Sequence, residues 1–119
     1  MVPDCSKAFR DVNIALANEM EEISNTYNAN FIKIKEMANQ HPRVNIHLPG
    51  IGVGGHCIPV DPHFLIQGNN VPLISVAREV NDKKPHKIAN IIGEKVIELK
   101  IKELDIYGMS YKPGVSDFR

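Results

Sequence analysis

The sequence predicts a mainly α-helical chain that ends with the first helix and strand of an incomplete α/β domain. Two observations lead to this prediction. In four segments before residue 100, apolar residues recur every three or four positions, which is the spacing of one face of a helix. Residues 103–108 instead alternate between polar and apolar side chains, as a strand does. A lone strand leaves its backbone groups unpaired, so we expect the second domain to be unfinished within these 119 residues.

The first two predicted helices span residues 9–27 and 31–39. A stripe at steps of four and three marks the first helix and consists of Val12, Leu16, Met20, Ile23 and Tyr27. In the second helix we expect Ile34 and Met37 to face the core. This helix should end before Pro42, because the residue that precedes a proline is disfavoured in helical geometry.

An irregular segment, residues 43–61, precedes three further predicted helices. Two short ones are expected over residues 62–67 and 73–82, the latter with Ile74, Ala77 and Val80 on one side. Pro85 suits the first turn of a longer third helix with apolar positions at Ile88, Ile91, Ile92, Val96 and Leu99. The expected domains are therefore residues 1–84, helical and containing the loop 43–61, and residues 85–119, the beginning of an α/β domain.

Charge and composition exclude several classes of protein. The 14 basic and 14 acidic residues give a formal net charge of zero, which disfavours binding to nucleic acid or to an anionic membrane surface. No apolar run approaches the ~20 residues of a membrane span, and the first residues resemble neither a signal peptide nor a transit sequence. We therefore expect a cytoplasmic protein in which Cys5 and Cys57 remain thiols.

The glycine-rich segment 50–62 is the part of the sequence that indicates chemistry. Four glycines precede Cys57 and let a ligand approach the backbone closely, while Asp61 follows the thiol at a spacing of four. A thiol in this position can act as a nucleophile. The alternatives are that Cys57 is a small buried apolar residue, that the glycines form a tight turn, and that Asp61 caps a helix beginning at Pro62.

Two other kinds of site are less consistent with the sequence. Five potential metal ligands lie in one stretch, namely His41, His47, His56, Cys57 and His63. Their spacings match none of the paired patterns that are typical of zinc, so no metal site is predicted. A cysteine hydrolase would need a base beside Cys57, and His56 should point elsewhere in an extended loop.

Five segments in the same order resemble the UDP-glucose/GDP-mannose dehydrogenase family, most closely its members that oxidise UDP-N-acetyl-D-mannosamine. They are FRDVNIALANE at residues 9–19, HPRVNIH at 41–47, GVGGHCIPVDP at 52–62, AREVND at 77–82 and YGMSYKP at 107–113. The resemblance covers nearly the whole chain. It implies the helical central dimerisation domain of a nucleotide-sugar dehydrogenase, followed by the start of the UDP-sugar-binding α/β domain.

The resemblance also implies an activity, a cofactor and site residues. In this family NAD accepts two hydrides while the sugar alcohol becomes a uronic acid through a thioester, which would form on Cys57. Asp61 matches the carboxylate that positions or activates water. The implied substrate-binding residues are Arg43, from the neighbouring subunit of a homodimer, and Gly54, Gly55, Tyr111 and Lys112. Arg119 matches a residue near NAD.

Two departures from the family pattern leave a second interpretation open. Pro3 and Lys7 stand where the family has a catalytic lysine and an oxyanion-stabilising asparagine. No Gly-x-Gly-x-x-Gly turn follows a strand, so we expect the NAD-binding Rossmann domain to be absent from this chain or supplied by a separate one. The alternative is a non-catalytic helical dimerisation module or an inactive remnant.

Overall fold

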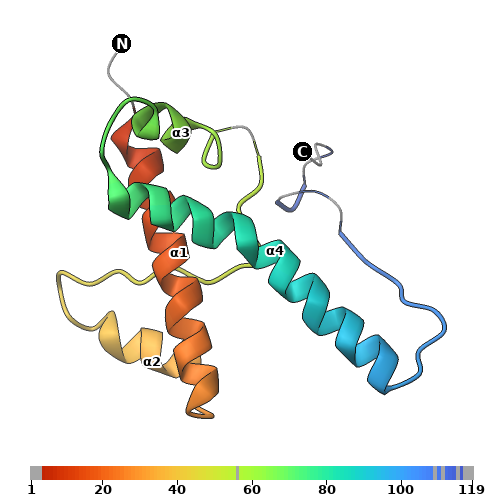
Figure 1. Cartoon of the computed structure of the whole chain (residues 1–119). Helices are drawn as coiled ribbons and strands as arrows, with labels where there is room; N and C mark the ends of the chain where they lie inside the picture. The colour runs from red at the N-terminus through yellow and green to blue at the C-terminus, as the bar shows by residue number, and fades with distance from the viewer. Residues whose placement is uncertain (1–3, 56, 109, 111, 115, 117–119) are drawn as a thin grey trace.

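The computed structural model describes residues 4–55, 57–108, 110, 112–114 and 116, and this part of the chain contains four helices and no strand. They are α1 (Cys5–Thr26), α2 (Phe31–Ala38), α3 (Asp61–Ile66) and α4 (Pro72–Glu98). Helices α1 and α4 cross, α3 packs on both of them near the beginning of α1, and α2 packs on α1 near its other end (Figure 1). None of the helices in the described segments is long and apolar enough to span a membrane.

Helix α1 begins four residues earlier than its apolar pattern indicates, because Asp4 caps it. The Asp4 carboxylate accepts a hydrogen bond from the backbone N–H of Ser6 at 3.0 Å. At the other end Asn28 adopts a positive φ of 52°, and the N–H of Ala29 reaches back to the Ser24 carbonyl at 2.8 Å. Such left-handed closures satisfy the last carbonyls of a helix, so both ends of α1 are fixed locally.

The buried face of α1 differs from its apolar stripe. Small and polar residues at steps of three and four lie at the crossing with α4, namely Ala8, Asp11, Ala15 and Asn18. The stripe lies on another side of the helix, where Leu16, Ile23 and Tyr27 are 44%, 58% and 79% exposed. Because alanine adds little bulk, the crossing helices can approach closely, and the larger apolar residues of α1 stay at the surface.

Helix α2 also turns a different face inward from the one expected. Asn30 caps it by accepting a hydrogen bond from Lys33 N–H at 3.1 Å, and Phe31 is buried. The prediction that Ile34 and Met37 face the core is wrong, since they are 43% and 70% exposed. The inward face contains Phe31 and the positions four and seven residues later, which excludes Ile34 and Met37 from it.

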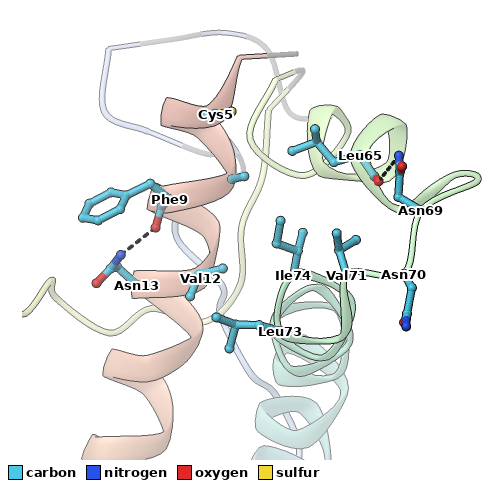
Figure 2. A pocket seen from close by; sticks show the side chains of 11 residues that line it. Cys5, Phe9, Val12, Asn13, Leu65, Asn69, Asn70, Val71, Leu73 and Ile74 are labelled. Atoms are coloured by element: carbon cyan, nitrogen blue, oxygen red, sulfur yellow. Dashed lines mark hydrogen bonds between the residues drawn. The ribbon is translucent and has the colours of Figure 1, made fainter. Parts of the chain in front are cut away.

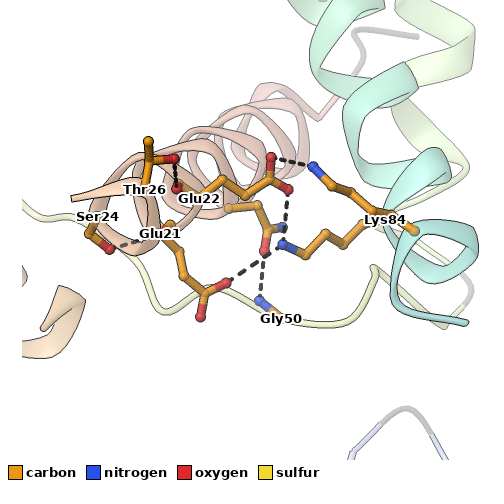
Figure 3. A network of polar contacts seen from close by, with 8 residues as sticks. Glu21, Glu22, Ser24, Thr26, Gly50 and Lys84 are labelled. Carbon is orange, nitrogen blue, oxygen red and sulfur yellow. Dashed lines mark hydrogen bonds and ion pairs between the residues drawn. The ribbon is translucent and has the colours of Figure 1, made fainter. Parts of the chain in front are cut away.

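Helix α4 is continuous where two helices were predicted. Pro85 lies inside it, although an internal proline removes one helical hydrogen bond and costs about 3 kcal/mol. Ion pairs to α1 hold the helix on both sides of the proline. Lys84 Nζ lies 3.3 Å from Glu22 Oε1, and Lys87 Nζ lies 2.5 Å from Glu22 Oε2. Figure 3 shows Lys84 pointing toward Glu21 and Glu22 of α1.

Residues 103–108 do not form the predicted strand. They run back as irregular chain after the end of α4 (Figure 1). The alternating pattern is present in the sequence, but no neighbouring strand exists in the described residues to pair with its backbone groups. The side chains of Ile106 and Tyr107 are largely exposed. The structure therefore confirms the mainly helical class and not the strand.

Candidate functional site

A cavity of about 470 Å³ lies between α1 and the glycine-rich loop. Helix α1 contributes Lys7, Arg10 and Ile14, which share one face because they follow at steps of three and four. The loop and the C-terminal segment contribute Gly52, Val53, Gly54, Gly55, Cys57, Ile58 and Lys112. A thiol, three cationic side chains and a stretch of glycine backbone therefore line one hollow.

Cys57 is exposed, so the interpretation of this residue as a small buried side chain is wrong. Its carbonyl accepts the N–H of Asp61 at 2.9 Å and that of Val60 at 3.3 Å. These bonds begin α3 and hold Cys57 and Asp61 one turn apart in the chain. Asp61 does not cap the helix, because Val60 is the N-cap residue and makes no side-chain capping bond.

The Asp61 carboxylate instead binds Lys7. Lys7 Nζ donates to Asp61 Oδ2 at 2.5 Å, joining the first turns of α1 and α3. This hydrogen bond raises the pKa of Lys7 above its usual value, burial opposes the shift, and the negative charge of Asp61 adds to it. Lys7 is therefore a cation at neutral pH with the carboxylate as its direct partner, in the lining of the cavity that contains the thiol.

Both long helices, α1 and α4, form hydrogen bonds with the loop. Asn18 of α1 accepts the N–H of Gly50 at 3.0 Å, and Arg78 of α4 donates toward the carbonyl of Ile58 at 3.5 Å. A Cβ on Gly52 would come within 2.7 Å of Pro85 Cγ, so a side chain does not fit there. Gly55 has a φ of 95°, a left-handed conformation that favours glycine. The glycines thus meet steric and conformational demands of the loop.

Arg78 also belongs to a buried polar cluster between α1 and α4. Arg78 Nη1 is 2.5 Å from Asp11 Oδ1, and Asn81 Nδ2 donates to the same carboxylate oxygen at 2.8 Å. Burial raises the pKa of Asp11, and the Arg78 charge and the Asn81 hydrogen bond oppose that rise. All three side chains are almost completely buried, and their contacts hold α1 against α4.

A larger cavity, of about 620 Å³, lies between the start of α1, the end of α3 and the start of α4. Figure 2 shows its mainly apolar wall, with Val12, Leu65, Val71, Leu73 and Ile74 among the lining residues. Cys5 belongs to this cavity and not to that of Cys57. We find no set of reactive groups in it comparable to the thiol, cations and glycine backbone of the smaller cavity.

A family model described as "UDP-glucose/GDP-mannose dehydrogenase family, central domain" matches residues 1–83. The chain belongs to this family. The matched residues include the first residues of all four helices, the glycine-rich loop and the crossing of α1 with the first part of α4. It confirms the resemblance that the sequence segments indicate.

Individual relatives agree with this assignment. The UDP-N-acetyl-D-mannosamine dehydrogenase of Methanocaldococcus jannaschii is 46% identical over 100% of the chain, and the NDP-N-acetyl-D-galactosaminuronic acid dehydrogenase of Ralstonia solanacearum is 45% identical over 94%. The structure of UDP-D-ManNAc dehydrogenase from Pyrococcus horikoshii superposes on 96% of the chain with a TM-score of 0.83 at 42% identity. The chain spans 28%, 27% and 29% of these three proteins, respectively.

The residues that the family pattern singles out are only partly brought together. Gly54, Gly55, Cys57 and Lys112 line the cavity. Arg43 is exposed in the segment after α2 and is not among the lining residues. Others fall outside the described residues, namely Pro3, His56, Tyr111 and Arg119.

Sequence reasoning missed several residues that build the site. Arg10 in the cavity wall was not singled out, nor were the residues behind the loop, namely Asp11, Asn18, Arg78 and Asn81. The signal was present in α1, where Asp11 and Asn18 alternate with Ala8 and Ala15 at helical spacing. Among the described residues, no cluster of histidine, cysteine and acidic side chains has the arrangement of a metal site.

Proposed function

We propose that this chain carries the thiol site of an NAD-dependent nucleotide-sugar 6-dehydrogenase. Its substrate would be UDP-N-acetylmannosamine or a related UDP-sugar, which becomes the uronic acid. The observation that carries the proposal is the exposed Cys57 in a cavity with glycine backbone and cationic side chains. Membership of the dehydrogenase family supports it. The names of two relatives give the substrate class, with different sugars.

The described residues do not fit NAD. A dinucleotide needs a glycine-rich turn between a strand and a helix, with its pyrophosphate at the helix N-terminus. Here the glycines follow irregular chain and pack on α1 and α4. NAD would accept the two hydrides of the reaction, and we assign its binding to another region of the protein or to a separate Rossmann-domain chain, with Arg119 approaching it.

The task of Cys57 is to hold the aldehyde that arises halfway through the oxidation. Its sulfur adds to the carbonyl carbon, and the carbonyl oxygen takes a proton, which gives a thiohemiacetal. At the thioester stage, water attacks the same carbon, the carbon–sulfur bond breaks, and the acid and the thiol are released. An exposed sulfur beside a backbone without side chains allows the close approach that both steps need.

Asp61 would act on the water that cleaves the thioester. Its carboxylate is half-buried, one turn after Cys57, and held by Lys7. A carboxylate fixed in this way can orient a water molecule and accept its proton as the water attacks. Lys7, which stands where the family has an asparagine, keeps this side chain in place.

The remaining substrate contacts in the proposal are divided between subunits. Lys112 would contact the nucleotide sugar from the cavity wall, with Tyr111 beside it in the sequence, and Gly54 and Gly55 would contact the sugar through their backbone. Arg43 lies away from its own cavity and would serve the substrate of a neighbouring subunit, where a guanidinium suits phosphate or carboxylate.

The exposed stripe of α1 supports the proposal of a homodimer through this helix. Leu16, Ile23 and Tyr27 lie on one side of the helix and are not covered by the chain's own core. An apolar surface of this kind is typical of a subunit interface, and symmetric dimers are the commonest assemblies. The second half of α4 also exposes Ile91, Ile92 and Ile97, which supports the assignment of residues 85–119 to an α/β domain that would cover them.

The alternative function is a helical dimerisation module without catalysis. The presence of Pro3 and Lys7 at family catalytic positions favours it, since the loss of oxyanion stabilisation costs ~3–4 kcal/mol in the transition state. In that case the α1 stripe would form the dimer interface, and Cys57 would have no catalytic role.

A chimera separates the two functions. This chain replaces the matching segment of the Methanocaldococcus jannaschii dehydrogenase, which supplies all remaining regions. We expect NADH to form with UDP-N-acetylmannosamine, and this activity to be lost in the Cys57→Ser chimera but not in a Cys5→Ser chimera. A folded, dimeric chimera that is inactive while the parent enzyme turns over would support the module instead.

A further inference from the structure

Asn39, the C-cap residue of α2, forms two hydrogen bonds with the backbone of Ile46. Its Oδ1 accepts the N–H of Ile46 at 2.8 Å, and its Nδ2 donates to the carbonyl oxygen of Ile46 at 3.3 Å. A side-chain amide that pairs with both backbone groups of one residue takes the place of a neighbouring strand. Because the two residues are seven positions apart, these bonds close residues 40–45 into a loop.

Arg43 lies in the middle of this closed loop. The N–H of Val44 donates to the His41 carbonyl at 3.0 Å, and the N–H of Arg43 donates to His41 Nδ1 at 3.2 Å. Pro42 fixes its own φ. The backbone around Arg43 is therefore fixed, whereas its side chain is exposed and has no ion pair or side-chain hydrogen bond within the described part of the chain.

We propose that Asn39 is a positioning residue for Arg43. By closing the loop at its base, Asn39 holds the guanidinium outside the chain's own cavity, where it meets an anionic group of the substrate in a neighbouring subunit. The inference rests on the proposed function for the role of Arg43, and it adds the residue on which that role depends. The ordinary alternative is that Asn39 only stabilises the end of α2.

Preorganisation is the physical reason for this role. A guanidinium binds two oxygens of a phosphate or carboxylate only when its plane has the correct orientation. If the loop were open at its base, its backbone would have to be ordered each time a ligand binds, and that entropy cost would lower the affinity. The two bonds of Asn39 meet this cost during folding instead, before any ligand arrives.

A second anchor separates this loop from the thiol. Asn18 of α1 accepts the N–H of Gly50 at 3.0 Å, and Gly50 lies between Ile46 and Cys57 in the chain. The glycine-rich loop therefore keeps its own attachment when the bonds of Asn39 are lost. We expect loss of the Asn39 amide to affect Arg43 and to leave the alkylation of Cys57 by iodoacetamide unchanged.

A double-mutant cycle in the Methanocaldococcus jannaschii chimera tests the inference. Calorimetry with UDP-N-acetylmannosamine, on the Cys57→Ser form and without NAD, gives a dissociation constant that does not depend on turnover. Asn39→Ala and Arg43→Ala are introduced separately and together. Asn39 has φ −72° and ψ −5°, which alanine adopts without strain, so we expect the variants to fold.

We expect Asn39→Ala to weaken binding about two- to tenfold, and Arg43→Ala to weaken it at least as much. The double variant should bind as Arg43→Ala does, because a positioning residue acts through the arginine that it positions. Asn39→Asp keeps the acceptor for the Ile46 N–H and should lie between Asn39→Ala and the wild type. Gln40→Ala, an exposed neighbour, is the control and should change nothing.

Amide hydrogen exchange on the chain itself tests the two bonds directly. The Ile46 N–H should exchange faster in Asn39→Ala than in the wild type or Asn39→Asp, and equal rates overturn the inference. Additive losses in the cycle, or an Asn39→Ala variant that binds like Gln40→Ala, also overturn it and leave the proposed function intact. Unchanged binding in Arg43→Ala overturns the inference together with the role of Arg43.

The opposite result is distinguishable as well. A Cys57 chimera that forms no NADH, while its Cys57→Ser form binds the nucleotide sugar with the expected non-additive losses, refutes the proposed catalysis. It leaves Asn39 as the positioning residue of a binding site.

Discussion

Gly52 lies so close to Pro85 that a Cβ on the glycine would come within 2.7 Å of the proline Cγ. The contact joins the glycine-rich loop to the middle of α4, at the residue where the sequence predicts the beginning of a helix. The proline ring is rigid, so it cannot move aside as the end of a long side chain would. The loop therefore packs directly against Pro85, the residue that interrupts the hydrogen bonds of α4.

Gly52→Ala should destabilise the fold and displace the loop. Overpacking at a close contact costs about 1–3 kcal/mol, so we expect a fall of this size in the free energy of unfolding measured in urea. The rate at which Cys57 is alkylated should change as well, because Gly52 and Cys57 belong to one loop and one cavity.

Gly93→Ala is the matched control for this substitution. Gly93 lies inside α4 with no atom within 4 Å of the Cβ position and no positive φ. Alanine should stabilise the helix there by up to ~1 kcal/mol and leave the alkylation of Cys57 unchanged. Equal effects of the two alanine substitutions would show that the Gly52–Pro85 contact does not constrain the loop.

Arg78→Ala should be strongly destabilising. It leaves the buried Asp11 carboxylate without its ion pair, and breaking a buried pair on one side costs about 3–5 kcal/mol. The double variant Asp11→Leu/Arg78→Met removes both charges and should regain most of that loss. Denaturant unfolding measures both values, with Lys83→Gln, which breaks an exposed pair with Glu79, as the control. A loss below about 1 kcal/mol in Arg78→Ala would contradict the assigned role.

The sequence was sufficient to predict a mainly helical chain, because the spacing of apolar residues along a helix is a local pattern. The exposure of Cys57 and the binding of Asp61 to Lys7 could not be predicted in the same way, since Lys7 is 54 residues from Asp61. The inward face of α1 was missed because hydrophobic periodicity identified the stripe of Leu16 and Ile23. The crossing with α4 instead uses alanines and a buried ion pair.

The continuity of α4 shows a second limit of local reasoning. A proline favours a helix start on sequence grounds, and that preference predicted two helices around Pro85. In the structure α4 continues through Pro85, and lysines on either side of the proline form ion pairs with Glu22 of α1. The strand predicted for residues 103–108 does not form, because an alternating pattern specifies a strand only where a partner strand is available.

The ion pairs of Glu22 should make the stability of the fold depend on pH in acid. The hydrogen bond from Lys87, with Lys84 adding to it, lowers the pKa of Glu22 below its usual 4.5. A lowered folded-state pKa contributes stability above pH 4.5 that is lost as the pH falls through the folded value. The difference in unfolding free energy between wild type and Glu22→Gln should be below about 1 kcal/mol and independent of pH near neutrality. It should become smaller in acid.

The ion pair of Lys7 and Asp61 should make the stability of the fold depend on pH in alkali instead of in acid. A raised folded-state pKa of Lys7 gives stability that is fully present below pH 10.5 and is lost as the pH rises through the folded value. Wild type should therefore be more stable than Lys7→Gln at neutral pH, and the two should converge in strong alkali. Urea titrations at several pH values measure this, and a difference that persists unchanged in strong alkali would contradict a contribution from the ammonium group.

The exposed stripe of α1 predicts how the chain associates. A carboxylate placed in a buried apolar interface costs more than ~1.4 kcal/mol, so Leu16→Glu and Ile23→Glu should each weaken self-association by about tenfold or more in sedimentation experiments. Ile97→Glu, at the far end of α4, is the control and should leave association unchanged, although Ile97 is as exposed as Tyr27. Equal weakening by all three substitutions would place the contact outside α1, and a wild-type chain that stays monomeric at high concentration would exclude the dimer.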